Sequence, residues 1–148
     1  MLIDCELEDI KYTATFFAHK LGISNTLCVL KIIESPSDTN DGVIKFISDD
    51  LLPSAIITLN PLCNRAAALA HELVHLKQYL LGELKDVEVD NKFHTYWMGE
   101  FYTDKLTFDM STEEYYFLPW EVEAFGKSVG LMALYNEISD DDLYSGNY

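Results

Sequence analysis

Residues 64–82, NRAAALAHELVHLKQYLLG, constrain the fold most, because they place two histidines four residues apart with a glutamate beside the first. On an α-helix, residues four apart differ by about 40° around the axis, so His71 and His75 point the same way and can hold one ion. Glu72 is turned by about 100° from His71. Its carboxylate can therefore accept a proton from water at that ion without binding the ion itself.

The same segment carries a second, apolar face at helical spacing. Leucines recur at intervals of four, three and four residues, at Leu69, Leu73, Leu76 and Leu80. Gly82 is a suitable residue to end the helix. The pattern predicts a helix that packs its leucines into a core and turns its histidines toward a cleft. The alternative is an exposed helix with solvated His and Glu, but the apolar Val74 and Leu81 beside the histidines favour burial.

Before this helix, the sequence predicts one helix and three strands. Residues 8–21 have an apolar helical stripe that ends at Gly22. Three runs rich in Val, Ile and Leu, at residues 26–33, 43–48 and 55–59, are separated by turn-forming residues such as Pro36, Asp49 and Asp50. A sheet of these strands can cover the leucine stripe and leave one edge open for an extended peptide.

After the histidine helix, an aromatic-rich segment at residues 92–108 predicts a hairpin. A second long helix is expected over residues 118–136, with Pro119 in its first turn and an apolar stripe of Val122, Phe125, Val129 and Met132. We expect residues 139–148 to be a mobile tail, with a docked tail as the alternative. The predicted fold is one α+β domain over residues 1–148, with an N-terminal helix, a small mixed sheet, the histidine helix and a C-terminal glutamate helix.

Composition limits the partners. The 148 residues carry a net charge of −15, which disfavours nucleic-acid and anionic membrane surfaces. The three cysteines form no CxxC pair, so we expect reduced thiols and no cysteine-rich zinc site. With no apolar run of membrane length and no basic, apolar leader, the sequence predicts a cytoplasmic protein, as a monomer or weak oligomer.

A catalytic zinc ion needs a third protein ligand and one open position. We expect Glu123 to supply it, because Glu123 shares a helix face with Gly126 and Gly130, which could allow another helix to approach closely. Glu121 is an alternative on the face that contains Ala124 and Ser128. The other alternative is His94, nineteen residues after His75, in the manner of proteases that resemble the SprT group.

HELVHLKQYLLGEL, followed about forty residues later by PWEVEAFG, resembles the small zincin metallopeptidases of the gluzincin type. The similarity is strongest to compact bacterial and phage proteins with a PWExEA stretch, and extends to the peptidase domain of the ImmA and IrrE regulators. It implies a minimal zincin-like core and selects Glu123 as the third ligand. Thermolysin-like enzymes have an Asp where this chain has Lys127, so support for a histidine must come from elsewhere.

The expected function is therefore a zinc-dependent endopeptidase of narrow specificity for a protein or peptide substrate, with Glu72 as general base. Tyr115, Tyr116 and His94 are candidates for stabilising the oxyanion, and Gln78 either orients a ligand or is solvated. The rival expectation is an acidic interaction protein that keeps the scaffold without hydrolysing its partner.

Overall fold

The computed structural model describes residues 1–47 and 51–148 and has the mixed α+β architecture that the sequence predicts, with two small sheets and helices at both ends of the chain. The first sheet has the strand order β1 (Leu2–Asp4), β2 (Val29–Glu34), β4 (Ser54–Leu59), β3 (Gly42–Ile47). The strands β1, β2 and β4 are parallel, and β3 is antiparallel at the edge.

Alternation of apolar side chains positions this sheet. The inward-facing residues on β2 and β4 are buried: Leu30, Ile32, Ala55, Ile57 and Leu59. Their neighbours along each strand are more exposed. The three predicted strands are confirmed. Ser48, the expected end of the second, and the turn residues Asp49 and Asp50 lie outside the described residues. The three-residue β1 was not predicted because it is too short to show a pattern.

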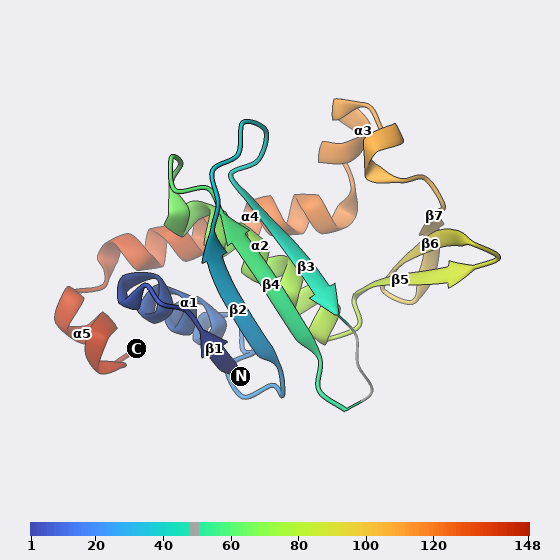
Figure 1. Ribbon diagram of the computed structural model, residues 1–148. Coiled ribbons are helices and arrows are strands. Elements are labelled where there is room, and N and C mark those ends of the chain that lie inside the picture. The colour runs from blue at the N-terminus through green and yellow to red at the C-terminus, as the bar shows by residue number, and fades with distance from the viewer. Residues whose placement is uncertain (48–50) are drawn as a thin grey trace.

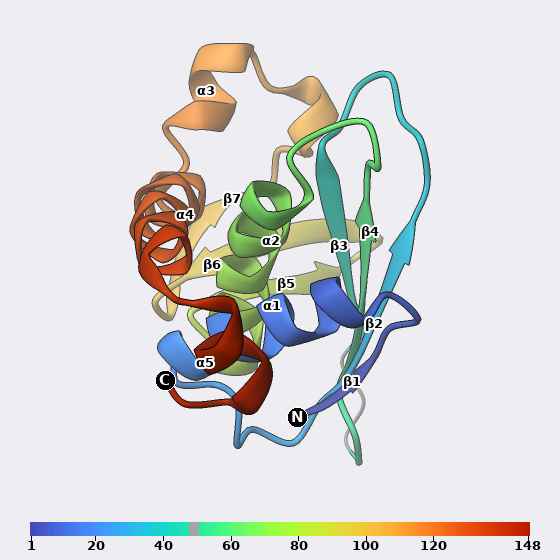
Figure 2. The same ribbon diagram turned by 90° about the vertical axis from the view of Figure 1, so that its left-hand side faces the viewer.

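Three helices form layers on one face of this sheet (Figure 2). Helices α1 (Glu8–Lys20) and α2 (Arg65–Leu80) contact the sheet, and α4 (Pro119–Glu137) packs on the far side of α2. The Asn64 side chain accepts a hydrogen bond from the Ala67 N–H and begins α2, while Gly82, at φ 69°, follows its end. In the predicted leucine stripe of α2, Leu69, Leu73 and Leu76 are completely buried, and Leu80 is partly buried.

The orientation of α4 corrects the prediction. Its buried residues are Trp120, Glu121, Ala124 and Leu131. In the expected apolar stripe, Val122 and Val129 face outward instead, at 54% and 72% exposure. Phe125 is 42% exposed with its ring on His71, and Met132 is partly buried against the core. Gly126 and Gly130 are also exposed, and a Cβ at either would meet nothing within 4 Å, so they do not serve a close helix contact. The physical reason is that α4 packs on α2 through a face that includes a glutamate, and apolar periodicity does not detect such a face.

A second sheet lies beyond β3, at the right in Figure 1. Its antiparallel strands are β5 (Leu84–Val89), β6 (Lys92–Trp97) and β7 (Glu100–Thr103), so the predicted hairpin is one part of a three-stranded meander. Asp90 and Asn91 join β5 to β6 with φ of 51° and 60°, as a tight two-residue turn requires. The 3-10 turn η1 (Thr107–Asp109) and the short helix α3 (Thr112–Tyr116) then lead into α4.

The last ten residues are docked, which corrects the expected mobile tail. They contain helix α5 (Asp140–Ser145), whose Leu143 is buried against the main core. The ring of Tyr148 lies edge-on to Phe16 at 5.0 Å, and Tyr144 meets Tyr12 at 5.1 Å. Contacts with aromatic residues of α1 offset the entropy of ordering these residues. Among the described helices, none is long and apolar enough to cross a lipid bilayer.

Candidate metal centre

Helix α2 presents His71, Glu72 and His75 to a cavity of about 700 Å³ that is also lined by β3, the second sheet and the start of α4. Glu72 and His75 are each only 7% exposed, and His71 is partly buried. The Nε2 atoms of the two histidines lie 3.1 Å apart, as expected for side chains one helical turn apart. The predicted pair of histidines is thus assembled and directed into a cleft.

Helix α4 brings a third donor to this pair. Glu121, 5% exposed, places Oε2 3.3 Å from Nε2 of His71 and Oε1 3.4 Å from Nε2 of His75. Pro119 starts the helix two residues earlier, so Glu121 occupies the first turn, where α4 meets the histidine face of α2. His71, His75 and Glu121 form a group able to hold a metal ion.

The donor atoms are close enough to share one ion. With ligand bonds of about 2.0–2.1 Å, a tetrahedral ion holds its ligand atoms about 3.3 Å apart. The two imidazole Nε2 atoms lie 3.1 Å apart, each has a different oxygen of Glu121 3.3 or 3.4 Å away, and one ligand atom from each residue lies within 4.8 Å of the others. Glu121 Oε2 is buried and has no hydrogen-bond partner within the described part of the chain, so its lone pairs are free for an ion. Two imidazoles and one carboxylate are also a donor set that catalytic zinc sites use.

The structure does not bring the other candidate ligands to this group. The prediction that Glu123 joins the histidines is wrong, because its carboxylate instead accepts hydrogen bonds from Gln78 and Lys77 and pairs with Lys127. Glu121 and Glu123 are two residues apart on a helix and so diverge by about 160° around its axis. His94 lies on β6, where its ring meets Phe101, and is not part of the group.

Glu72 lies between α2 and the edge strand. The backbone N–H of Ile44 on β3 hydrogen-bonds its carboxylate, and Gly42 leaves the space that its side chain fills. Burial is the main cause that raises the pKa of Glu72, and the neighbouring histidines oppose it. A carboxyl with a raised pKa beside a metal group is suited to taking up and releasing a proton.

The two histidines have different surroundings behind their metal-facing nitrogens. Nδ1 of His75 lies 2.9 Å from Oε1 of Gln78, a residue with 0% exposure, so the expectation of a solvated Gln78 is wrong. In contrast, Nδ1 of His71 has no hydrogen-bond partner among residues 1–47 and 51–148. The ring of His71 is held by packing, with the Phe125 ring centroid 4.5 Å away.

His75 and Glu121 shift one another's pKa in the metal-free protein. Burial raises the pKa of Glu121, but the two imidazoles outweigh it and hold the pKa at about 2. Burial lowers the pKa of His75, but Glu121 and Gln78 raise it more, so the net change is upward. Glu121 is therefore ionised at neutral pH, and its carboxylate attracts a cation.

Of the three oxyanion candidates, Tyr115 lies nearest the metal group. It lines the same cavity, and burial together with Glu121 raises its pKa, so its hydroxyl keeps its proton and can donate it in a hydrogen bond. Tyr116 is half exposed and packs on Phe125 at 5.4 Å. His94 does not line this cavity.

Comparisons with protein-family models, with curated proteins and with solved structures found no match to this chain. Function therefore has to be argued from the arrangement of residues alone.

Proposed function

We propose that this protein is a zinc-dependent endopeptidase in which His71, His75 and Glu121 hold the ion and Glu72 is the general base. The observation that carries the proposal is the convergence of two imidazoles and one buried carboxylate: the two Nε2 atoms lie 3.1 Å apart, and each has one oxygen of Glu121 within 3.4 Å. The neighbouring carboxylate of Glu72 favours hydrolysis over a purely structural site, because a structural site needs no base. The resemblance of the sequence to small zincins supports the same function.

Glu72 and Tyr115 have separate roles in the proposed reaction. When bound, zinc supplies a Lewis acid that polarises a peptide carbonyl and acidifies water. Glu72 accepts a proton from the attacking water and passes it to the amine nitrogen as the peptide bond breaks. Tyr115 donates a hydrogen bond to the oxyanion that develops on the former carbonyl oxygen.

The edge of β3 is the proposed binding position for the peptide backbone. Hydrogen-bonding groups alternate along a strand, and the Ile44 N–H faces Glu72, so the backbone groups of Gly42, Ile44 and Phe46 point away from β4. A peptide added as a further strand would run past the metal group, with its main chain held by the outward groups other than the Ile44 N–H, which binds Glu72.

A second cavity, of about 630 Å³, suits a substrate side chain. It shares Tyr79, Leu84 and Trp120 with the metal cavity. The ring of Phe46 stacks on Tyr79 with centroids 5.0 Å apart and forms one wall. The remaining apolar lining residues come from the second sheet and the segment before α3: Phe93, Leu106 and Met110. We infer that the preferred substrates carry a large apolar or aromatic side chain near the scissile bond.

Metal analysis and one isosteric variant test the proposal. Purified protein should contain close to one equivalent of zinc and cleave members of a peptide library. Glu72→Gln should retain the zinc and lose at least about 10²-fold in cleavage rate, because it removes the base and keeps the shape. Loss of zinc on dialysis against a chelator should abolish cleavage, and added zinc should restore it.

Two results would overturn the proposal. Full activity in Glu72→Gln would remove the assigned base, and the absence of any bound zinc from active protein would remove the assigned cofactor. A protein that binds zinc and a stable partner without cleaving any library peptide would instead fit the rival, a non-hydrolytic interaction protein.

A further inference from the structure

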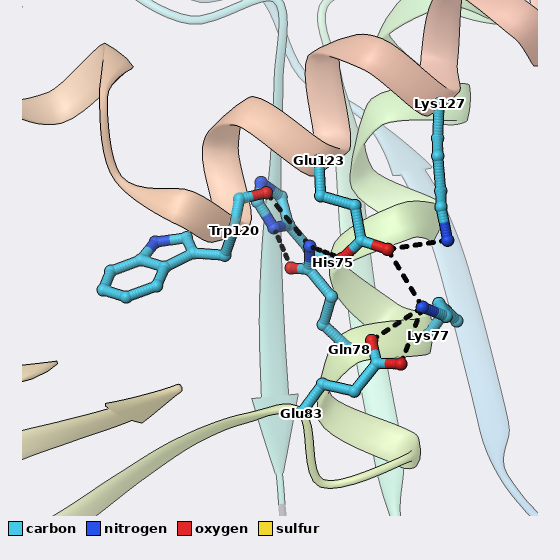
Figure 3. A network of polar contacts seen from close by, with 7 residues as sticks. All are labelled: His75, Lys77, Gln78, Glu83, Trp120, Glu123 and Lys127. Atoms are coloured by element: carbon cyan, nitrogen blue, oxygen red, sulfur yellow. Dashed lines mark hydrogen bonds and ion pairs between the residues drawn. The ribbon is translucent and has the colours of Figure 1, made fainter. Parts of the chain in front are cut away.

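A completely buried amide stands behind one of the two histidines. Gln78 follows His75 by three residues on α2, and its Oε1 lies 2.9 Å from Nδ1 of His75 (Figure 3). Nε2 of the same ring faces His71 and Glu121. The hydrogen bond to Gln78 is therefore on the side of the imidazole opposite the metal group.

The partners of Gln78 fix which way its amide faces. Its Nε2 lies 3.0 Å from the carbonyl oxygen of Trp120 and 2.9 Å from Oε2 of Glu123. Both of these atoms only accept hydrogen bonds, so the NH₂ end must face them and the oxygen must face His75. Nδ1 of His75 then has to carry the hydrogen, which leaves a lone pair on Nε2.

Glu123 is itself held in place by two cations. Its Oε1 lies 2.6 Å from Nζ of Lys127 and 3.1 Å from Nζ of Lys77, and Lys77 also binds both carboxylate oxygens of Glu83 at 2.7 and 2.8 Å. Lys77 is 8% exposed. Two carboxylates and two ammonium groups balance in charge, so Glu123 remains an ionised acceptor for the Gln78 amide.

We propose that Gln78 and Glu123 are positioning residues that fix the tautomer and ring orientation of His75 for metal binding. Gln78 acts directly on His75, and Glu123 acts through Gln78. This inference rests on the proposed metal function. It gives Glu123, which the sequence suggests as a ligand, a place one contact behind a ligand.

Zinc affinity, measured by competition with a chelator, tests the inference. Gln78→Leu should weaken zinc binding by about 10–100-fold, the usual effect of losing such a partner. Gln78→Glu should weaken it as well, because a carboxylate at this position has no hydrogen to offer Glu123 or the Trp120 carbonyl. The double variant Gln78→Glu/Glu123→Gln reverses donor and acceptor and should recover about tenfold over the single Gln78→Glu variant.

A matched control separates positioning from loss of a buried polar group. Thr13 is 2% exposed on α1, and its hydroxyl hydrogen-bonds the Asp9 carbonyl and the Tyr135 hydroxyl. Thr13→Val should lower the melting temperature and leave zinc affinity unchanged, whereas the Gln78 variants change zinc affinity. If the double variant binds zinc no better than Gln78→Glu alone, the proposed order of donors and acceptors from Glu123 through Gln78 to His75 is wrong.

The tautomer gives a readout that does not depend on metal. In the metal-free protein with neutral His75, long-range proton–nitrogen correlation spectra should show hydrogen on Nδ1, and Gln78→Leu should give a mixture of tautomers. Wild-type protein that binds no zinc but shows this tautomer would overturn the proposed function and support the positioning of His75. Wild-type zinc affinity in every variant would overturn the inference and leave the proposed function standing.

Discussion

Replacing each glutamate of the PWEVEAFG segment by glutamine should identify the third metal ligand. Glu121 has its two oxygens 3.3 and 3.4 Å from the histidine nitrogens, whereas Glu123 binds Gln78, Lys77 and Lys127. Zinc sites with four protein ligands bind with about 10–16 kcal/mol, or roughly 3–4 kcal/mol per ligand. Glu121→Gln should therefore raise the zinc Kd by about 10²–10³-fold, and Glu123→Gln by at most about tenfold.

Glu121→Gln should also lower the stability of the metal-free protein. The pKa of Glu121 is about 2 against an ordinary 4.5, a difference that corresponds to up to about 3 kcal/mol. A lowered carboxyl pKa stabilises the fold above pH 4.5, and the effect is lost as pH falls toward 2. At pH 7, Glu121→Gln should thus lower the metal-free melting temperature by about 6–12 °C.

Competition titrations with a chelator and thermal unfolding by circular dichroism measure the two effects. For zinc affinity, Glu123→Gln is the comparison variant, since it makes the same change two residues away on the same helix. For thermal unfolding, Glu121→Gln is compared with the wild type, because the pKa of Glu123 is also lowered to about 2. A larger loss of zinc affinity in Glu123→Gln than in Glu121→Gln would refute the assignment of the third ligand.

The remaining predictions concern space and charge at three other positions. A Cβ at Gly42 would lie 3.2 Å from Cγ of Glu72, so Gly42→Ala should displace the base and lower kcat while zinc affinity is unchanged; equal kcat would show that Glu72 adjusts freely. Gly126→Ala meets nothing within 4 Å in mid-helix and should raise stability by about 1 kcal/mol, visible as a melting temperature about 2–4 °C higher. The pKa of Glu114 is lowered to about 2, first by Lys105, so carboxyl titration by NMR should show a midpoint near 2, and Lys105→Met should move it upward toward 4.5.

The elements with strong periodicity were predictable from sequence. In α2, the spacing of the leucines and of the histidines indicates one helix with an apolar and a polar face, and the glycine after it indicates where the helix ends. Strands β2, β3 and β4 each show apolar runs between turn residues, and β2 and β4 bury alternate side chains as such runs predict. These features are local, so a single sequence contains them.

The placement of α4 was harder to predict because its packing face is partly polar. Val122, Phe125 and Val129 form an apolar stripe in projection, yet Val122 and Val129 face outward, and Phe125 is 42% exposed although its ring packs on His71. The face that packs on α2 combines Glu121 with Ala124, whose small side chain allows close approach. To choose the face with Glu121 over the apolar face, one has to know that the histidine face of α2 lies opposite, where a carboxylate can pair with the two imidazoles.

The contact between α2 and α4 explains why site and stability are linked in this chain. It buries Glu121 against His71 and His75 in one place, and Gln78 against Trp120 and Glu123 in the next. Buried polar groups are costly unless they are paired, so these contacts together favour one alignment of the two helices. The same alignment holds the two Nε2 atoms 3.1 Å apart and places one oxygen of Glu121 3.3 or 3.4 Å from each of them. A zinc ion bound there would replace the contacts between imidazole and carboxylate with metal bonds while leaving the alignment unchanged, so the polar interface prepares the site before metal arrives.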